Sequence, residues 1–237
     1  MTRRRWIADE VSGNRAALIG SHAQHLARVL RAHVGQQFDI AAGGSLRRGV
    51  VTSISDDRVE FELAEELPPG VTPRISLMLA VFKFDRMEWA IEKCTELGVA
   101  RVIPVIARRT DAHLAHTAPN RVERWERISR QAAEQSRRSV PPEICPPLRL
   151  KDAVLQPAAT RILLSESEQN RTLRQALESH AAQADLLLAI GTEGGWASEE
   201  IALFAQSGWT SASLGNTILR AETAAIAATA IAVSELS

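Results

Sequence analysis

Residues 186–201 read LLLAIGTEGGWASEEI, and this stretch decides the fold class. Leu186 to Ile190 is a short, wholly apolar run, typical of a strand buried on both faces of a parallel sheet. The run ends at the GTEGG turn, residues 191–195, and we expect a helix over residues 198–207. A strand, a glycine turn and a helix in this order form one step of an α/β fold, and such a turn is a common place to hold a phosphate.

The same alternation extends over most of the chain beyond residue 70. We expect strands over residues 75–82, 101–106, 161–164, 186–190 and 210–214. We expect helices over residues 85–97, 119–139, 172–182, 198–207 and 219–236. This alternation predicts a mostly parallel sheet with helices on both faces. Ligands of such sheets lie outside the carboxyl ends of the strands, so the loops near residues 165, 191 and 215 form the candidate site.

The first part of the chain follows a different pattern. Short alternating segments at 37–40, 49–54 and 58–63 are separated by glycine and aspartate turns. They predict a small antiparallel sheet or barrel, with one helix over residues 23–31 packed beside it. Leu67-Pro68-Pro69-Gly70 can continue neither a strand nor a helix. We therefore expect two domains, residues 1–70 and residues 71–237.

Charge is balanced overall but not along the chain. Twenty-eight basic residues match 28 acidic ones, so the whole protein has no field that would draw it onto nucleic acid. Residues 1–49 nevertheless hold eight arginines against three acidic residues, whereas residues 50–70 hold one arginine and six acidic residues. The first segment could present a basic face to RNA phosphates, or it could be an ordinary solvated surface.

Several classes of site and location are disfavoured. The apolar stretch 224–233 is too short to span a bilayer, and no apolar segment follows the N-terminal arginines, so we expect a cytoplasmic protein without an export signal or membrane contact. Cys94 and Cys145 are far apart and are expected to be reduced thiols. The pairs His22/His25 and His113/His116 lack further ligands nearby, so no metal site is expected.

Two loops carry the candidate chemistry. GTEGG has glutamate where the dinucleotide fingerprint needs its second glycine, and Glu193 would repel a phosphate. The loop is better suited to a neutral or cationic ligand, although a plain tight turn is the alternative. In SLGNTILRAETA, residues 213–224, Gly215 allows close approach of the backbone and Arg220 offers a fixed set of donors to an anionic oxygen. Alternatively, Arg220 pairs with Glu222 or Glu193.

Two helices have open interpretations. Arginines recur at 121, 124, 127 and 130 with glutamates between them, so the stripe could follow a phosphate backbone but is better read as a solvated surface. Trp125, Ile128 and Ala132 supply the core-facing stripe of that helix. The last helix is nearly all alanine, isoleucine and valine, which indicates burial on most sides. We expect a homodimer on that ground, with a central core helix as the alternative.

Five stretches together resemble the RsmE family of bacterial 16S ribosomal RNA methyltransferases. They are HLARVLRAHVGQQFDI (25–40), FDRMEWAIEKCTELGVARVIPVIARRT (84–110), RWERISRQAAEQSRRSVPPEI (124–144), IGTEGGWASEEI (190–201) and SLGNTILRAETA (213–224). The resemblance covers nearly the whole chain in the right order. It implies an N-terminal PUA-like RNA-binding β-barrel and a C-terminal SPOUT-type α/β domain with a trefoil knot over about residues 162–224, a rare exception to unknotted topology.

The resemblance also implies an activity. Members of the family act as homodimers and transfer a methyl group from S-adenosylmethionine to N3 of a uridine in 16S rRNA near the decoding centre, without a metal. The residues that match the cofactor loops here are Leu164, Ser165, Gly191, Glu193, Gly194, Leu214, Gly215, Ile218, Leu219 and Arg220. The arginines expected to hold rRNA phosphates in the small ribosomal subunit are Arg3, Arg4, Arg5, Arg28, Arg31, Arg47 and Arg48.

Arg220 and Glu193 are the expected catalytic residues. Arg220 would stabilise the anion formed when uridine N3 loses its proton, and Glu193 or a water molecule would accept that proton. The chain departs from the family, which usually has proline at the position of Thr192, proline and arginine at Asn216 and Thr217, and commonly glycine at Phe84. These departures leave two other functions open: a non-catalytic RNA-binding ribosome-assembly factor, and a SPOUT enzyme modifying another nucleotide, such as a ribose 2'-hydroxyl in tRNA.

Overall fold

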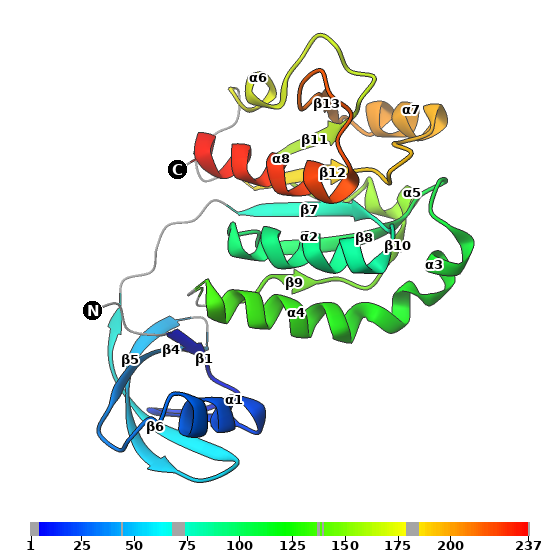
Figure 1. Cartoon of the computed structure of the whole chain (residues 1–237). Coiled ribbons are helices and arrows are strands. Elements are labelled where there is room, and N and C mark those ends of the chain that lie inside the picture. The colour runs from blue at the N-terminus through cyan, green and yellow to red at the C-terminus, as the bar shows by residue number, and fades with distance from the viewer. Residues whose placement is uncertain are drawn as a thin grey trace. The chain divides into compact units, whose positions relative to one another are not determined.

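The structure is a computed structural model that describes residues 5–43, 45–67, 74–136, 138, 140–178 and 185–236. The chain separates into two compact units, each drawn in Figure 1. The smaller consists of residues 1–71 together with 133–141, and the larger of residues 72–132 together with 142–237. No signal in the sequence indicated that residues 133–141 belong with the N-terminal segment.

In the smaller unit, the described residues form one curled sheet of six strands (Figure 1). The strands are β1 (Arg5–Ile7), β2 (Glu10–Ser12), β3 (Arg15–Ile19), β4 (Gln37–Ala42), β5 (Ser45–Ile54) and β6 (Arg58–Leu67). Their order is β1-β4-β5-β6-β3-β2, with every pair antiparallel except β1 with β4. The antiparallel pairing of the three later segments was predicted. The first three strands were not, because they are short and lack a clear alternation.

A short helix lies beside this sheet, as predicted. It begins as α1 (Ser21–Gln24), continues as a π-helical turn, η1 (His25–Val29), and ends two residues before the expected Arg31. Arg31 has a φ of 50°, which no helix accommodates. Leu26 of η1 is buried with Leu18 and Phe61 in the core of the unit.

The larger unit contains a parallel sheet, as predicted. Its strands are β7 (Ile75–Ala80), β8 (Arg101–Ile106), β9 (Glu143–Ile144), β10 (Leu148–Arg149), β11 (Thr160–Leu164), β12 (Leu186–Ile190) and β13 (Thr210–Ala212). Among these strands the order is β10-β8-β7-β12-β11-β13, with β9 also paired to β8. Every recorded pair is parallel. The strands expected over residues 75–82 and 210–214 are two residues shorter than predicted at their carboxyl ends.

Helices cover both faces of this sheet. They are α2 (Phe84–Glu96), α3 (Ala112–Thr117), η2 (Ala118–Arg121), α4 (Val122–Gln135), α5 (Leu150–Ala153), α6 (Leu173–Leu177), α7 (Ser198–Gln206) and α8 (Ala221–Leu236). On β7, Leu77 and Leu79 face the core shared with α2 and α8, which lie along one face in Figure 1. Met78 and Ala80 alternate with them and face the core shared with α5 and α7. The predicted two-sided α/β arrangement is therefore confirmed.

The helix expected over residues 119–139 is wrong at its start. Asp111 caps a separate helix, α3, by accepting hydrogen bonds from the backbone N–H groups of His113 and Leu114. A 3₁₀ turn then joins α3 to α4, which ends at Gln135. An aspartate at the N-cap of a polar helix was the signal that the sequence offered. The helix expected over residues 172–182 is observed as α6, and residues 179–184 lie outside the described part of the chain.

One aromatic contact and two arginines explain how α2 and α4 pack together. Phe84, at a position where the resembling family commonly has glycine, contacts the buried ring of Trp125 edge to face, with 6.1 Å between the ring centroids. The guanidinium of Arg121 lies over the Phe84 ring at 4.6 Å, and Arg124 forms an ion pair with Glu88. Part of the arginine stripe of α4 therefore serves packing within the protein.

The alanine-rich helix α8 has one side in the core. Ala225, Ala228 and Ala232 are fully buried, and Thr229 contacts the Cys94 thiol of α2 at 3.6 Å. Alanines let the two helices approach closely, while Ile226 and Ile231 on other sides of α8 are only partly buried. Burial raises the pKa of the Cys94 thiol to about 12, so this cysteine is an inert thiol, as predicted. Cys145 is also a free thiol.

Gly49 of β5 provides a test of core packing in the smaller unit. A Cβ atom at this position would lie 2.4 Å from Cγ1 of Ile40 and 3.4 Å from Cβ of Phe61. Gly49→Ala should therefore lower the free energy of unfolding by about 1–3 kcal/mol, measured by urea denaturation. Ile40→Ala alone should cost about 2–5 kcal/mol, and the double variant should cost less than the two together. Additive losses would contradict the proposed clash.

Candidate functional site

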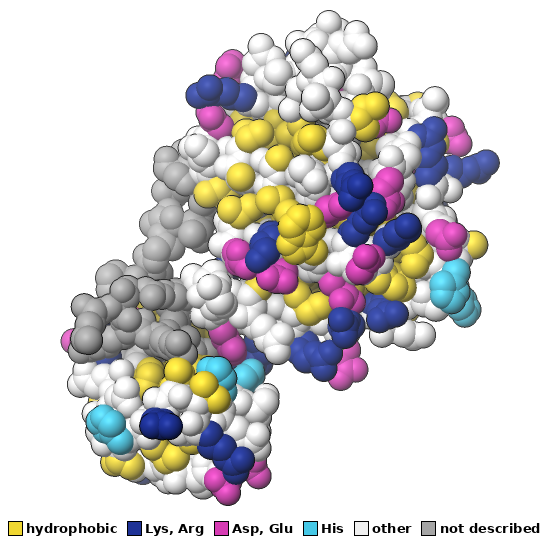
Figure 2. Space-filling model, viewed as in Figure 1, with side chains coloured by type: hydrophobic (Ala, Val, Ile, Leu, Met, Phe, Trp, Pro, Cys, Tyr) yellow, Lys and Arg dark blue, Asp and Glu magenta, His cyan; other side chains and the backbone are white. Residues whose placement is uncertain are grey.

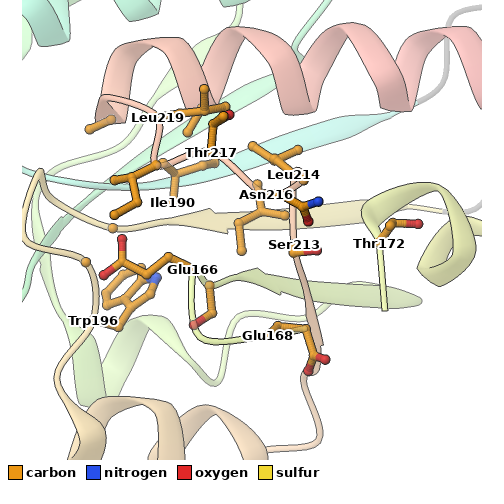
Figure 3. A pocket seen from close by; sticks show the side chains of 18 of the residues that line it. Glu166, Glu168, Thr172, Ile190, Trp196, Ser213, Leu214, Asn216, Thr217 and Leu219 are labelled. Carbon is orange, nitrogen blue, oxygen red and sulfur yellow. The ribbon is translucent and has the colours of Figure 1, made fainter. Parts of the chain in front are cut away.

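The main cavity of the larger unit lies where three neighbouring strands end. Loops after β11, β12 and β13 enclose about 520 Å³ at the carboxyl edge of the sheet, where the sequence placed the site. The lining residues are Leu164, Ser165, Glu166, Glu168, Gln169, Thr172, Ile190, Gly191, Thr192, Gly195, Trp196, Ser213, Leu214, Gly215, Asn216, Thr217, Ile218, Leu219, Ala221 and Ala224. Figure 3 shows Ile190 and Trp196 on one side of this space and the 214–219 segment on the other.

The GTEGG loop is a tight turn that only glycine can complete. The backbone N–H of Gly195 donates to the carbonyl of Thr192 at 2.9 Å. Gly195 has a φ of 69°, and a Cβ atom there would lie 2.7 Å from Oε1 of Glu166. The turn thus presents its backbone, rather than side chains, to the neighbouring cavity.

A buried carboxylate fixes the helix that follows this loop. Glu200 is 6% exposed and accepts hydrogen bonds from the backbone N–H of Ala197 at 2.8 Å and of Arg108 at 2.7 Å. The first bond satisfies a backbone N–H group at the start of α7, and the second attaches the loop that follows β8 to that helix. Sequence analysis missed Glu200, although a glutamate three residues into a helix is a familiar capping signal.

The 213–220 segment is held by α6. The backbone N–H of Ser213 donates to the carbonyl of Arg171, and the N–H of Leu173 donates to the carbonyl of Ser213, both at 2.9 Å. Thr172, which lies between Arg171 and Leu173 in the chain, caps α6 with its side chain. These bonds place Leu214 and Leu219 over the cavity in Figure 3.

Most of the residues predicted to bind a cofactor line this cavity. Leu164, Ser165, Gly191, Leu214, Gly215, Ile218 and Leu219 do so, whereas Glu193, Gly194 and Arg220 do not. Glu166, Asn216 and Thr217 also line the cavity and lie within the loops that the resemblance assigned to the cofactor, residues 164–166 and 214–220. Glu168 and Trp196 lie just beyond the predicted loops, so they could have been found by extending each loop by one or two residues.

The lining of the cavity has an acidic bias. The carboxylates of Glu166 and Glu168 belong to it, and Figure 3 shows Glu166 beside the indole of Trp196. The lining residues include neither lysine nor arginine. This charge distribution disfavours phosphate and suits a ligand that is neutral or cationic, the class predicted from Glu193 alone.

Arg86 of α2, rather than Arg220, contacts Glu193 and Glu222. Its Nη1 donates to Oε1 of Glu193 at 3.2 Å, and its Nε lies 3.9 Å from Oε1 of Glu222, which is 3% exposed. Arg220 is exposed and makes neither a hydrogen bond nor an ion pair through its side chain within the described chain. The alternative in which Arg220 pairs with Glu222 or Glu193 is therefore wrong, and its guanidinium is available to a ligand.

Three of the seven predicted RNA-binding arginines have partners within the smaller unit. Arg28 pairs with Asp56 at 3.2 Å, Arg48 pairs with Asp39 at 3.4 Å, and Arg47 donates to the carbonyls of Leu63 and Ala64. Arg31 is exposed, whereas Arg3, Arg4 and the side chain of Arg5 lie outside the described part of the chain.

The histidines of the first predicted pair also have protein partners. His22 lies 3.0 Å from a carboxylate oxygen of Asp9 and 3.7 Å from one of Glu134. Within the described residues, three or more histidine, cysteine or acidic side chains nowhere gather to hold a metal ion. The described helices include none that is long and apolar enough to cross a membrane.

Comparison with known proteins identifies the family. The profile of the RNA methyltransferase domain family matches residues 71–233. A ribosomal RNA small subunit methyltransferase E from Synechocystis is 34% identical over 87% of this chain and 69% of its own length. One from Mycobacterium bovis is 32% identical over 92% and 85%, respectively. The chain belongs to the ribosomal RNA small subunit methyltransferase E family.

Solved structures of similar proteins agree with this membership. A family member from Neisseria gonorrhoeae bound to S-adenosyl methionine is 26% identical, covers 97% of this chain and 96% of its own, and superimposes with a TM-score of 0.83. A putative methyltransferase from Legionella pneumophila in complex with the same cofactor is 28% identical, covers 98% and 97%, and has a TM-score of 0.84. The predicted resemblance is confirmed.

The contact between Arg86 and Glu222 yields a stability prediction. Arg86→Met should lower the free energy of unfolding by about 1–3 kcal/mol, because the buried carboxylate of Glu222 loses its nearest cation. Adding Glu222→Gln should recover part of this loss, as measured by urea denaturation.

Arg124→Met is the matched control. It removes a shorter ion pair, with Glu88 at 2.6 Å, in which the arginine is exposed, and should cost less than about 1 kcal/mol. If Arg86→Met costs no more than this control, or if Glu222→Gln fails to recover stability, the buried pair does not have the role assigned to it.

Proposed function

We propose that the protein uses S-adenosylmethionine to methylate N3 of a specific uridine in 16S rRNA of the small ribosomal subunit. The observation that carries this proposal is the cavity at the ends of β11, β12 and β13, which has carboxylates and no cations in its lining. The chain belongs to a family whose members from N. gonorrhoeae and other bacteria are named methyltransferases. Two of the similar structures contain this cofactor.

The residues present fit the cofactor. The volume of about 520 Å³ lies within the range of small-molecule sites, and Leu164, Ile190 and Leu219 offer apolar walls to an adenine ring. Glu166 and Glu168 suit the sulfonium and amino group, which are both cationic. The indole N–H of Trp196 is buried without a hydrogen-bond partner in the protein, and is free to donate to a ligand.

The chemistry of this chain follows from the placement of Arg220. S-adenosylmethionine supplies an activated methyl group, so no metal is needed. Uridine N3 becomes nucleophilic when it loses its proton and the charge spreads onto the adjoining carbonyl oxygens. Arg220, exposed and unpaired, would stabilise that charge, but it cannot act as the base because guanidinium does not deprotonate in proteins. Glu193 is engaged by Arg86, which leaves a water molecule as an alternative proton acceptor.

The remaining architecture is assigned in the same proposal. The curled sheet of the smaller unit would be the PUA-like RNA-binding barrel over residues 1–70, and the SPOUT domain would cover residues 71–237 with a trefoil knot over about 162–224. The three cavity loops all fall within that knotted range. We place the protein in the cytoplasm, where its RNA substrate is made.

A homodimer is part of the proposal, supported by the surface over α2 and α8. Trp89 of α2 is 49% exposed and Ile218, before α8, is 81% exposed. Figure 2 shows yellow apolar side chains spread over this region of the larger unit. Large apolar side chains grouped on a surface indicate a binding face.

Methylation of small-subunit particles tests the whole proposal. Particles from a strain lacking this activity are incubated with labelled S-adenosylmethionine, and the digested RNA is mapped by mass spectrometry. A single N3-methyluridine is the expected product. No incorporation, together with no cofactor binding by calorimetry, would instead support the ribosome-assembly factor, and a modified ribose in another RNA would support the other SPOUT activity.

Replacing Arg220 tests the catalytic assignment. Arg220→Ala should lower the methylation rate about 10²–10³-fold, the usual effect of losing one donor to a developing anion. Binding of S-adenosylmethionine should change little, since Arg220 does not line the cavity. Arg149→Ala, which removes an exposed arginine at the end of β10, is the control. A rate within a few fold of wild type in a folded Arg220→Ala protein would exclude this role.

Replacing Glu166 tests whether the main cavity recognises the positive charge of the cofactor. If Glu166 faces the sulfonium, Glu166→Gln should weaken binding of S-adenosylmethionine by roughly tenfold or less, an effect of one exposed charge. Binding of the thioether product, which keeps the amino group but lacks the sulfonium charge, should change little. Isothermal titration calorimetry with both ligands measures the difference. Equal weakening for both would show that Glu166 does not act on the sulfonium charge.

A further inference from the structure

A second, smaller cavity adjoins the site described above. It encloses about 300 Å³ and lies beyond the carboxyl ends of β7 and β8, next to β12 in the same sheet. Its lining residues are Val81, Phe82, Lys83, Arg109, Asp111, Leu114, Thr192 and Glu193. Thr192 lines both cavities, so a single residue of the GTEGG loop separates them.

The apolar wall of this second cavity is preformed. Val81 and Phe82, which continue β7, are buried, and Leu114 comes from α3. The hydroxyl of Thr110 donates to the carbonyl of Val81 and accepts from the N–H of Ala107, both at 3.1 Å. The loop after β8 is thereby fixed against the end of β7. A flat, uncharged ring would find an apolar surface here without rearrangement.

Two cationic side chains line the second cavity. Lys83 is exposed, and its ammonium group has no ion pair or hydrogen bond among the described residues. Arg109 is also exposed and donates to the carbonyl of Gly194, so it lies against the GTEGG loop. The two carboxylates are already engaged, since Asp111 caps α3 and Glu193 bonds to Arg86. Figure 2 shows dark blue side chains gathered over this part of the larger unit, around the beginning of α2 and α3.

We propose that this second cavity receives the target nucleotide. Its base would lie against the wall formed by Phe82 and Leu114, and the adjoining phosphate would meet Lys83 and Arg109. A base must leave its stack to enter such a pocket, and an apolar wall beside a cation matches the two parts of an unstacked nucleotide. The assignment rests on the proposed function, because it requires a methyl donor in the main cavity on the other side of Thr192.

Filling the second cavity tests this assignment. Leu114→Trp places a large ring in it, where Thr192 is the one lining residue shared with the main cavity. We expect kcat/KM for methylation of small-subunit particles to fall at least about a hundredfold, while the Kd for S-adenosylmethionine stays within about twofold, because only substrate positioning is lost. His116→Trp introduces the same ring at an exposed position on the same helix and should leave both values unchanged.

Removing the cation provides a second, milder test. Lys83→Ala should raise the KM for the particles several-fold, up to about tenfold, with little change in kcat, and the difference should shrink as salt is added. The Lys83 side chain does not cap α2, so its loss should not affect folding. Lys151→Ala, an exposed lysine on α5, is the charge-matched control.

The outcomes separate the two proposals. If wild type binds no S-adenosylmethionine and methylates no RNA, the proposed function fails and this assignment fails with it. If wild type is active and Leu114→Trp, folded and with its ring in the cavity, is equally active, only the assignment of the second cavity is overturned. If Leu114→Trp does not fold, Lys83→Ala decides: a KM and salt dependence equal to those of wild type would overturn the assignment.

Discussion

The burial of β12 is the constraint on which the rest of the larger unit depends. All five residues, Leu186–Ile190, are buried between β7 on one side and β11 on the other. A strand paired on both edges and covered on both faces cannot shift its register without exposing apolar side chains. The loop that leaves it at Gly191 therefore starts from a fixed point, and both cavities are arranged around that loop.

The charged side chains around this loop are paired in such a way that some of them remain available to a ligand. Arg86 forms a hydrogen bond with Glu193 and lies near Glu222, the two carboxylates that the sequence offered as partners of Arg220. With these two glutamates held by Arg86, Arg220 stays exposed, and Glu166 and Glu168 are the charges that a ligand meets in the main cavity. One arginine from a helix distant in sequence thus determines which groups remain available for chemistry.

The sequence predicted the α/β alternation well because β8 and β12 are apolar runs of strand length bounded by glycine or charge. It predicted the lining of the main cavity because loops at the carboxyl ends of adjacent strands must converge. It missed α3, β9 and β10, which are too short for any periodicity to be seen. Arg86 and Glu200 also escaped prediction, since their roles depend on partners about 100 residues away in the chain. Such partners become apparent only when the sheet order is known.

The two hydrogen bonds of Glu200 have a dynamic consequence. One carboxylate holds the loop after β8, through Arg108, and the start of α7, through Ala197. Neither loop can open fully without leaving a buried charge short of a donor, so the free energies of opening the two loops are coupled. The amide protons of Arg108 and Ala197 consequently belong to one cooperative unit of hydrogen exchange, although they are far apart in the sequence. Trp196 of one cavity and Arg109 of the other, which adjoin these two residues in the chain, are thereby expected to move together.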